Sequence, residues 1–253
     1  VDDVHPIGGA QAIAALAYGT ESVKPVNVIV GPGNVYVSLA KQEVAGKVGI
    51  PASFAGPSEI MVIADSTAPP KFAAVDLAVQ AEHGPGGKSW LVTTDEDFAS
   101  AVIDELEILV ASSSRGENIK ETLETGGYCA LVEDIDSAVE IVDAVAPEHL
   151  QIMLPNPEEV AKKVSNAGAI FCGNWSPASL GDYLAGPSHV LPTAGSARFS
   201  GALTVNDFMR DMHIVTSSES ALKRIGPHIV NFATAEGLES HADSIRLRGI
   251  ENE

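Results

Sequence analysis

Basic and aromatic residues are scarce in this chain. Of its 253 residues, 15 are Lys or Arg and 34 are Asp or Glu, which gives a formal net charge of −19. Because phosphate groups must be neutralised by basic side chains, this balance argues against nucleic acids and anionic membranes as partners. Aromatic residues make up 5% of the chain, which leaves little material for stacking nucleotide bases.

Cysteines and long apolar runs are equally rare. The two cysteines, Cys129 and Cys172, lie far apart in apolar surroundings and form no CxxC pattern, which favours buried thiols in a reducing compartment. No apolar run approaches the ~20 residues of a membrane-spanning helix. We therefore expect a cytoplasmic protein, although the chain begins at Val1 and a targeting segment before it would be invisible.

Hydrophobic residues account for 45% of the chain, enough to build a globular core. Short apolar segments alternate with helical ones, which predicts parallel sheets covered by helices, an α/β fold. The expected strands are 27–30, 60–63, 90–93, 128–132, 150–154 and 169–172. The expected helices are 10–18, 35–46, 71–83, 95–112, 134–144 and 157–166.

The pattern changes after Asn174. Residues 174–204 are rich in Gly, Pro and Ser and show little periodicity, and long loops of this kind are usually functional. From about residue 216 onward the chain is expected to be largely helical, with Ser217 and Ser218 available to cap the first helix.

A turn between an expected strand and helix, Gly31-Pro32-Gly33-Asn34, is the first candidate for ligand binding. Such a turn lets the backbone approach a phosphate at a helix N-terminus. Tyr36 stands where a full GxGxxG motif would have its third glycine, so an ordinary turn explains the segment equally well.

A second candidate is the end of the helix expected over 71–83. Gln80 and His83 are three residues apart, share one helical face, and could present an amide oxygen and an imidazole to a metal ion. The alternative is a simple helix end at which His83 interacts favourably with the helix dipole. Glutamine is an uncommon zinc ligand, which favours the alternative when the motif is taken alone.

The third candidate is Glu148-His149, directly before an expected strand. A carboxylate beside an imidazole suits proton transfer near neutral pH, with His149 as base and Glu148 acting on water. A surface glutamate next to a histidine at a helix end remains an equally simple interpretation.

Further polar residues occur in the loop after Asn174 and near the C-terminus. Asp182 could complete a metal site, His189 could contact a polar substrate, and Glu236 and His241 lie in a late helical segment. A set comprising Gln80, His83, Asp182 and His241 would offer N and O ligands without a thiolate, which suits Zn²⁺, or Mn²⁺ or Co²⁺ in its place. Spacing alone does not assemble this set.

Taken in order, these motifs resemble the histidinol dehydrogenase family. The matching stretches run across nearly the whole chain: GGAQAIAALAYGT (8–20), VGPGNVYV (30–37), AGPSEIMVIAD (55–65), QAEHGP (80–85), APEHLQ (146–151), GDYLAGPSHVLPT (181–193) and AEGLESHA (235–242). The resemblance implies oxidation of L-histidinol to L-histidine through L-histidinal, with two NAD⁺ and one zinc ion, at the end of histidine biosynthesis.

The resemblance also implies a role for each matched residue. Glu148 and His149 match the acid–base pair, and Gln11 and Asn34 match NAD contacts. The implied zinc ligands are Gln80, His83, Asp182 and His241. The implied substrate contacts are Ser58, Gln80, His83, His149, Asp182, His189, Glu236 and His241.

The family fold implied for this chain consists of incomplete Rossmann-like parallel-sheet domains covered by helices, with a small helical C-terminal tail domain. Residues 1–58 correspond to the C-terminal part of an NAD-binding domain, 59–204 to the main α/β catalytic domain and 205–253 to a dimerisation tail. Family members form an intertwined homodimer with shared active sites. They are also longer at the N-terminus, so this chain could need a second polypeptide.

Two other interpretations remain open. One is a related dehydrogenase that acts on another polar alcohol, such as a sulfonated diol. The presence of Ser58, His189 and Glu236 together argues against it, because these positions match the binding of an amino-imidazole substrate. The other is a metal-binding fragment or assembly partner with no activity of its own.

Overall fold

The computed structural model describes residues 1–51 and 56–249. The chain divides into two compact units, Val1–Met209 and Arg210–Glu253, which we describe separately. The first unit contains all the strands found in the described residues, and most of the helices.

The centre of the first unit is a five-stranded parallel sheet in the order β3-β2-β1-β4-β5. From β1 the chain adds β2 and β3 on one side of the sheet, and then β4 and β5 on the other side. This is the strand order of a Rossmann-like doubly wound fold. The α/β class predicted from the alternating pattern is confirmed. The strands are β1 (Glu59–Ala64), β2 (Lys88–Thr93), β3 (Gly127–Leu131), β4 (His149–Met153) and β5 (Ala169–Cys172).

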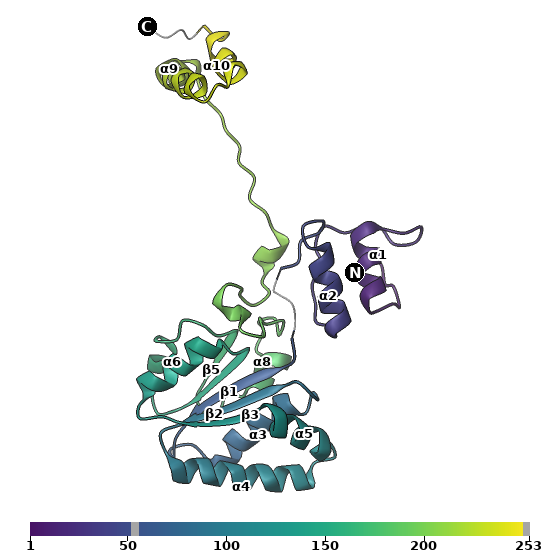
Figure 1. Ribbon diagram of the computed structural model, residues 1–253, viewed down its shortest axis with the longest axis vertical. Coiled ribbons are helices and arrows are strands. Elements are labelled where there is room, and N and C mark those ends of the chain that lie inside the picture. Colours follow the sequence, from purple (N-terminus) through teal and green to yellow (C-terminus); the bar gives the residue numbers. More distant parts are fainter. Residues whose placement is uncertain (52–55, 250–253) are drawn as a thin grey trace. The chain divides into compact units, whose positions relative to one another are not determined.

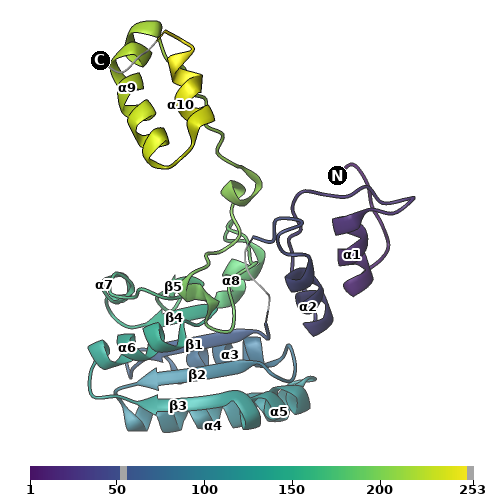
Figure 2. The same cartoon turned by 45° about the horizontal axis from the view of Figure 1, so that its top comes forward.

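Helices cover both faces of this sheet (Figures 1 and 2). One face packs against α3 (Pro70–Ala81), α4 (Glu96–Ser112), α5 (Gly116–Gly126) and α8 (Ala178–Tyr183). The other packs against α6 (Ile135–Val145) and α7 (Pro157–Ala161). Because both faces are covered, the central strands are largely apolar, and most of the polar residues that they contain, among them Glu59, His149 and Gln151, are buried. All six residues of β1 are buried.

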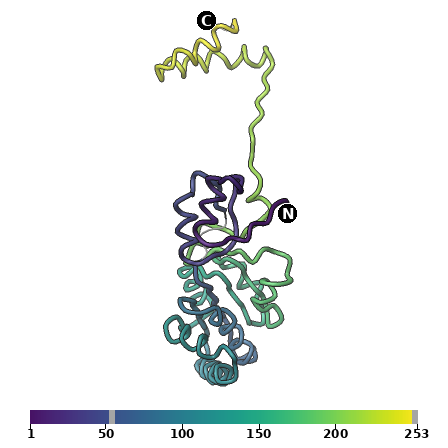
Figure 3. The backbone as a smooth tube through the Cα atoms, turned by 90° about the vertical axis from the view of Figure 1, so that its right-hand side faces the viewer, coloured from purple at the N-terminus to yellow at the C-terminus, as the bar shows by residue number. Residues whose placement is uncertain are grey.

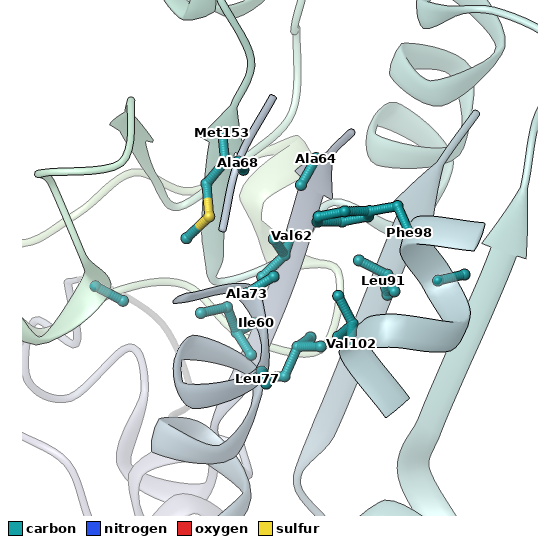
Figure 4. Packing of buried hydrophobic residues seen from close by; sticks show 13 residues of the cluster. Ile60, Val62, Ala64, Ala68, Ala73, Leu77, Leu91, Phe98, Val102 and Met153 are labelled. Carbon is teal, nitrogen blue, oxygen red and sulfur yellow. The ribbon is translucent and has the colours of Figure 1, made fainter. Parts of the chain in front are cut away.

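The core on the α3 side is built from alternate residues of β1. Ile60 and Val62 point toward α3 and α4, where they meet Leu77, Leu91 and Val102 (Figure 4). Met61 and Ile63 point the other way, into the cluster under α6. In the parallel register Ile60 pairs with His149, so the His149 side chain lies on the α3 face of the sheet.

Residues 1–51 form a separate helical pair with its own small core. The helices are α1 (Ala10–Tyr18) and α2 (Val35–Val44), and their core comprises Ile13, Ala17, Ile29, Val44 and Val48. The strand expected over 27–30 was wrong, since Val28 makes only an isolated bridge with Gly49. A β-branched run forms a strand only where a neighbouring strand is available to pair with it.

The second unit is a helical hairpin of α9 (Glu219–Ala235) and α10 (Glu239–Arg246). Val230, Ala233, Ala242 and Ile245 form its own core. Ser218 caps α9 by accepting a hydrogen bond from the Ala221 N–H, as its sequence position indicated. Residues 210–218 contain no helix or strand and run as an extended segment (Figure 3).

Most remaining differences from the sequence-based expectations concern weak helices. The helix expected over 157–166 stops at Ala161, and α5 and α8 were not anticipated. Among the described residues, no helix combines the length and the apolar character needed to cross a membrane.

Candidate active site at the amino-terminal edge of the sheet

The end of α3 brings Gln80 and His83 to the edge at which the strands begin. The helix ends at Ala81, and Gly84 then adopts a left-handed backbone with φ of 116°, a conformation that favours glycine. The His83 N–H still donates to the Gln80 carbonyl oxygen at 3.3 Å. The two side chains therefore lie one helical turn apart, as their spacing predicted.

The Gln80 side chain fits the role of a ligand. It is 2% exposed, and its Nε2 atom finds no hydrogen-bond partner among the described residues. A buried amide without a partner is unfavourable, which indicates that something else should contact it. Because the two ends of a glutamine amide are exchanged by a simple rotation, its oxygen can take the same place and coordinate a cation.

One turn before Gln80, Asp76 is also buried on α3, at 5% exposure. Burial raises its pKa to about 6 from an ordinary 3.8. The raised folded-state pKa means that ionising Asp76 opposes folding. The free-energy cost that ionised Asp76 adds to folding is absent below pH 3.8, grows between the two pKa values, and is complete above pH 6.

Asp76→Asn is therefore expected to stabilise the protein at pH 8, by as much as about 3 kcal/mol, and to have little effect below pH 4. Urea unfolding of both proteins across this pH range measures the difference. Exposed Asp104→Asn is the matched control. A stability gain of equal size at every pH would contradict a cause in ionisation.

The Glu148-His149 pair lies where β1 and β4 begin side by side. Both residues are buried, at 9% and 3% exposure. The Glu59 N–H donates to Glu148 Oε2 at 2.9 Å, and His149 Nδ1 lies 2.9 Å from the Glu59 carbonyl oxygen. Glu148 Oε2 is 3.4 Å from the same ring nitrogen. The interpretation of this pair as a surface glutamate and a helix-end histidine is thus wrong.

These contacts define the state of the His149 ring. A backbone carbonyl only accepts hydrogen bonds, so Nδ1 carries a proton and Nε2 is the atom available as a base. Nε2 is buried and has no hydrogen-bond partner among the described residues. Phe171 stacks on the ring with centroids 5.9 Å apart and planes inclined by 22°, which fixes its orientation.

Asp182 approaches the free side of the ring from α8. Its Oδ1 lies 3.4 Å from His149 Nε2, beyond ordinary hydrogen-bond length. The preceding residue, Gly181, permits this approach, because a Cβ there would lie 2.6 Å from Phe171 Cζ. The loop expected to be functional therefore delivers a carboxylate to His149.

The charges of this group are strongly coupled. Burial by itself lowers the pKa of His149, but contact with the Asp182 and Glu148 carboxylates reverses the effect and raises it to about 10. Pairing with His149 holds the pKa of Asp182 below its usual range, with smaller contributions from His189 and His83 and against the opposing effect of burial. The charges of three imidazoles thus act on the Asp182 carboxylate, and His149 is the one with a direct contact.

The first unit also contains other predicted site residues, whose burial and surroundings differ. Ser58 is half-buried directly before Glu59, and exposed His189 lines a pocket together with Asp182. Pro32 and Gly33, from the predicted phosphate turn, line one cavity with Ser58 and His83. The last residue of that turn, Asn34, caps α2 by accepting hydrogen bonds from the N–H groups of Tyr36 and Val37. Gln11 lies exposed on α1.

Glu236 and His241 belong to the second unit. Glu236 follows the last turn of α9, and His241 lies on α10. The first unit therefore carries three of the four predicted ligands: Gln80, His83 and Asp182. Within residues 1–51 and 56–249, no three His, Cys, Asp or Glu side chains gather closely enough to hold a metal ion.

Three contributors to this site were not identified from the sequence. Glu59 contacts both members of the predicted acid–base pair. Phe171 stacks on the His149 ring. Gln151 donates a hydrogen bond to the Gly173 carbonyl oxygen at 2.9 Å, at the start of the loop that leads to α8. A charged or amide residue inside an otherwise apolar strand was the available signal for Glu59 and Gln151.

Comparison with known proteins identifies the family. A relative named histidinol dehydrogenase from Clostridium acetobutylicum is 50% identical over 248 residues, which are 98% of this chain and 57% of the relative. One of the same name from Bacillus cereus strain ATCC 10987 is 47% identical over 253 residues, 59% of its length.

The crystal structure of a histidinol dehydrogenase from Elizabethkingia anophelis superimposes with a TM-score of 0.89 at 36% identity. The matched region covers 95% of this chain and 55% of the Elizabethkingia anophelis chain. The chain thus spans a little more than half the length of these relatives. A family model described as histidinol dehydrogenase matches residues 1–249, and the chain belongs to that family.

Proposed function

We propose that this chain takes part in the oxidation of L-histidinol to L-histidine through L-histidinal, with two NAD⁺ and one zinc ion. The observation that carries the proposal is the buried Glu148-His149 pair, whose orientation is fixed by the peptide groups of Glu59 beside Asp182. A glutamate and a histidine at the protein surface would not need to be buried and hydrogen-bonded to peptide groups in this way.

Gln80, His83, Asp182 and His241 are the proposed zinc ligands. The unpartnered buried amide of Gln80 and the influence of His83 on the charge of Asp182 support the first three. A bound zinc ion supplies a positively charged anchor for the amine and imidazole of the substrate. Asp182 would then be shared between the cation and His149, which would remove part of the interaction that raises the His149 pKa.

His149 is the proposed base for both oxidation steps. Its Nδ1 proton is held by the Glu59 carbonyl, so Nε2 accepts the proton of the alcohol and later that of the aldehyde hydrate. NAD⁺, when bound, supplies the hydride acceptor for each step, and Gln11 and Asn34 are its proposed contacts. Because Phe171 stacks on the ring, the accepting nitrogen keeps one direction throughout.

Glu148 is the proposed base toward water. One of its oxygens, Oε2, is occupied by the Glu59 N–H, which leaves the other oxygen to accept a proton from the water that hydrates the aldehyde. Ser58, Gln80, His83, His149, Asp182, His189, Glu236 and His241 are the proposed substrate contacts. Burial around His149 keeps bulk water away from the reactive aldehyde.

We further propose that residues 1–58 form part of an NAD-binding domain, that residues 59–204 form the catalytic domain, and that residues 205–253 are a dimerisation tail. In the proposed intertwined homodimer, Glu236 and His241 complete the active site of the partner. The independent core of α9 and α10 supports a tail that folds as a body of its own.

The metal can be tested directly on the full-length protein. We expect about one divalent ion per chain, most readily zinc, because four ligands of mixed N and O type are provided. Elemental analysis measures the metal, and chelation is expected to abolish NAD⁺ reduction with L-histidinol. Gln80→Ala should lower the bound metal, whereas the exposed Gln42→Ala, on α2, should not. A metal-free protein that retains activity would contradict the ligand assignment.

A further inference from the structure

The side chain of Glu59 has no role in the mechanism described so far. It is 3% exposed at the start of β1, where a charged group is costly to bury. Its Oε2 accepts the Ala194 N–H at 3.3 Å. Burial raises the pKa of this carboxyl, and the backbone N–H groups of Ala194 and Glu148 oppose the rise. One buried carboxylate thus joins the beginning of β1 to a turn 135 residues later in the chain, at Ala194.

The peptide groups of Glu59 point at the catalytic pair. Its N–H contacts the Glu148 carboxylate and its carbonyl contacts the His149 ring, each at 2.9 Å. The position of the Glu59 backbone therefore sets the orientation of both catalytic side chains. Loss of the carboxylate contact with the Ala194 N–H would loosen the start of β1, on which that orientation depends.

The turn at Ala194 is also held in an unusual conformation. Ala194 has a left-handed backbone with φ of 53°, which is uncommon for a residue with a Cβ and persists only where its surroundings hold it. The neighbouring Thr193 is 2% exposed and accepts a hydrogen bond from the Gly56 N–H, three residues before Glu59. Two contacts, Glu59 with Ala194 and Gly56 with Thr193, thus connect this turn to the start of β1.

We propose that Glu59 is a positioning residue whose carboxylate ties the start of β1 to the turn at Ala194, so that Glu148 and His149 keep the orientation needed for proton transfer. The inference rests on the proposed function for its kinetic test. A carboxylate suits this position because it only accepts hydrogen bonds, and the Ala194 N–H is a donor. A glutamine is uncharged and accepts through one atom only, so its hydrogen bond with the Ala194 N–H is weaker.

The kinetic test uses Glu59→Gln in the full-length protein. We expect kcat for L-histidinal oxidation to fall at least about tenfold, more than kcat for L-histidinol oxidation, because the displaced Glu148 acts on water. KM for both substrates should stay within about twofold, since no proposed substrate contact is removed. Glu59→Asp retains an acceptor-only group and should give an intermediate kcat.

The control is Val102→Ala, which empties part of the core between α4 and the sheet, away from the catalytic pair. It should lower stability in urea without changing kcat for either substrate. If Glu59→Gln likewise lowers only stability, the carboxylate serves the fold alone and the proposal is overturned. Should Glu59→Gln fail to fold, Glu59→Asp decides: a loss confined to aldehyde oxidation supports the proposal, and wild-type kcat overturns it.

A second readout does not depend on turnover. In the wild-type protein, ¹⁵N NMR should show a proton on His149 Nδ1 and slow exchange of the Ala194 amide. In Glu59→Gln we expect the Nδ1–H signal to broaden and the Ala194 amide to exchange at least about tenfold faster. Unchanged signals would overturn the positioning role. A wild-type protein that oxidises neither substrate would instead refute the proposed function, and the NMR result would still decide the role of Glu59.

Discussion

His149→Asn is expected to slow the oxidation of both L-histidinol and L-histidinal by about 100-fold or more, because it removes the base that the two steps share. Glu148→Gln should slow the oxidation of L-histidinal by a similar factor and that of L-histidinol much less, since only the aldehyde must be hydrated. Single-turnover NAD⁺ reduction with each substrate measures the two steps separately.

The design of these variants keeps the fold intact. In Glu148→Gln the new amide oxygen can still accept the Glu59 N–H, and in His149→Asn the side-chain NH₂ can still donate toward the Glu59 carbonyl. Matched controls are Glu159→Gln on α7 and His228→Asn on α9, both exposed, which should leave both rates unchanged. Mild and equal losses in both steps would refute the proposed division of labour.

The positions of the proposed catalytic residues run against a common rule for parallel sheets. Ligands of doubly wound sheets usually bind beyond the carboxyl ends of the strands. Here Glu148 and His149 lie where β4 begins, next to the first residue of β1, Glu59. The carboxylate of the pair is held by a strand N–H, a contact available where a strand starts.

Local sequence was sufficient to predict the sheet. The runs around Ile60, Leu91 and Ile152 are short and mostly buried, and each is followed by a helix, so the pattern favours a parallel α/β fold. Helix α5 was not predicted from the sequence, because only two of its residues, Ile119 and Leu123, pack into the core. Three glycines also lie at its ends, at positions 116, 126 and 127. Its stability comes from tertiary contact more than from propensity.

The site was predicted only where local spacing carried the information. The one-turn separation of Gln80 and His83 follows from helix geometry, and Gly84 marks the helix end. The contacts of Glu59 with Glu148 and His149 span 89 and 90 residues and exist only because β1 and β4 are neighbours. Spacing along the chain does not reveal such neighbours; strand order does.

The final prediction concerns which chain supplies His241. We expect a full-length His149→Asn variant and a His241→Ala variant each to be inactive as homodimers, because each carries the same lesion in both sites. If the proposed tail of one chain completes the site of the other, a heterodimer has both lesions in one site and an intact second site. Unfolding and refolding an equal mixture makes half of the dimers heterodimers, so activity should return to about a quarter of wild type.

The arithmetic of this mixture separates the two arrangements sharply. If His241 serves its own chain, every site in the heterodimer keeps one lesion, and the mixture stays as inactive as its parents. Distinct affinity tags on the two variants show whether heterodimers have formed, and refolded wild-type protein gives the recovery expected from refolding alone.

A mixture of His149→Asn with Glu148→Gln is the matched control. Both of these lesions lie in the first unit, at the start of β4, so exchange of tails cannot separate them from an intact site, and the control should recover no activity. Recovery in the first mixture alone would assign His241 to the partner's site, and its absence despite confirmed heterodimers would refute the shared site.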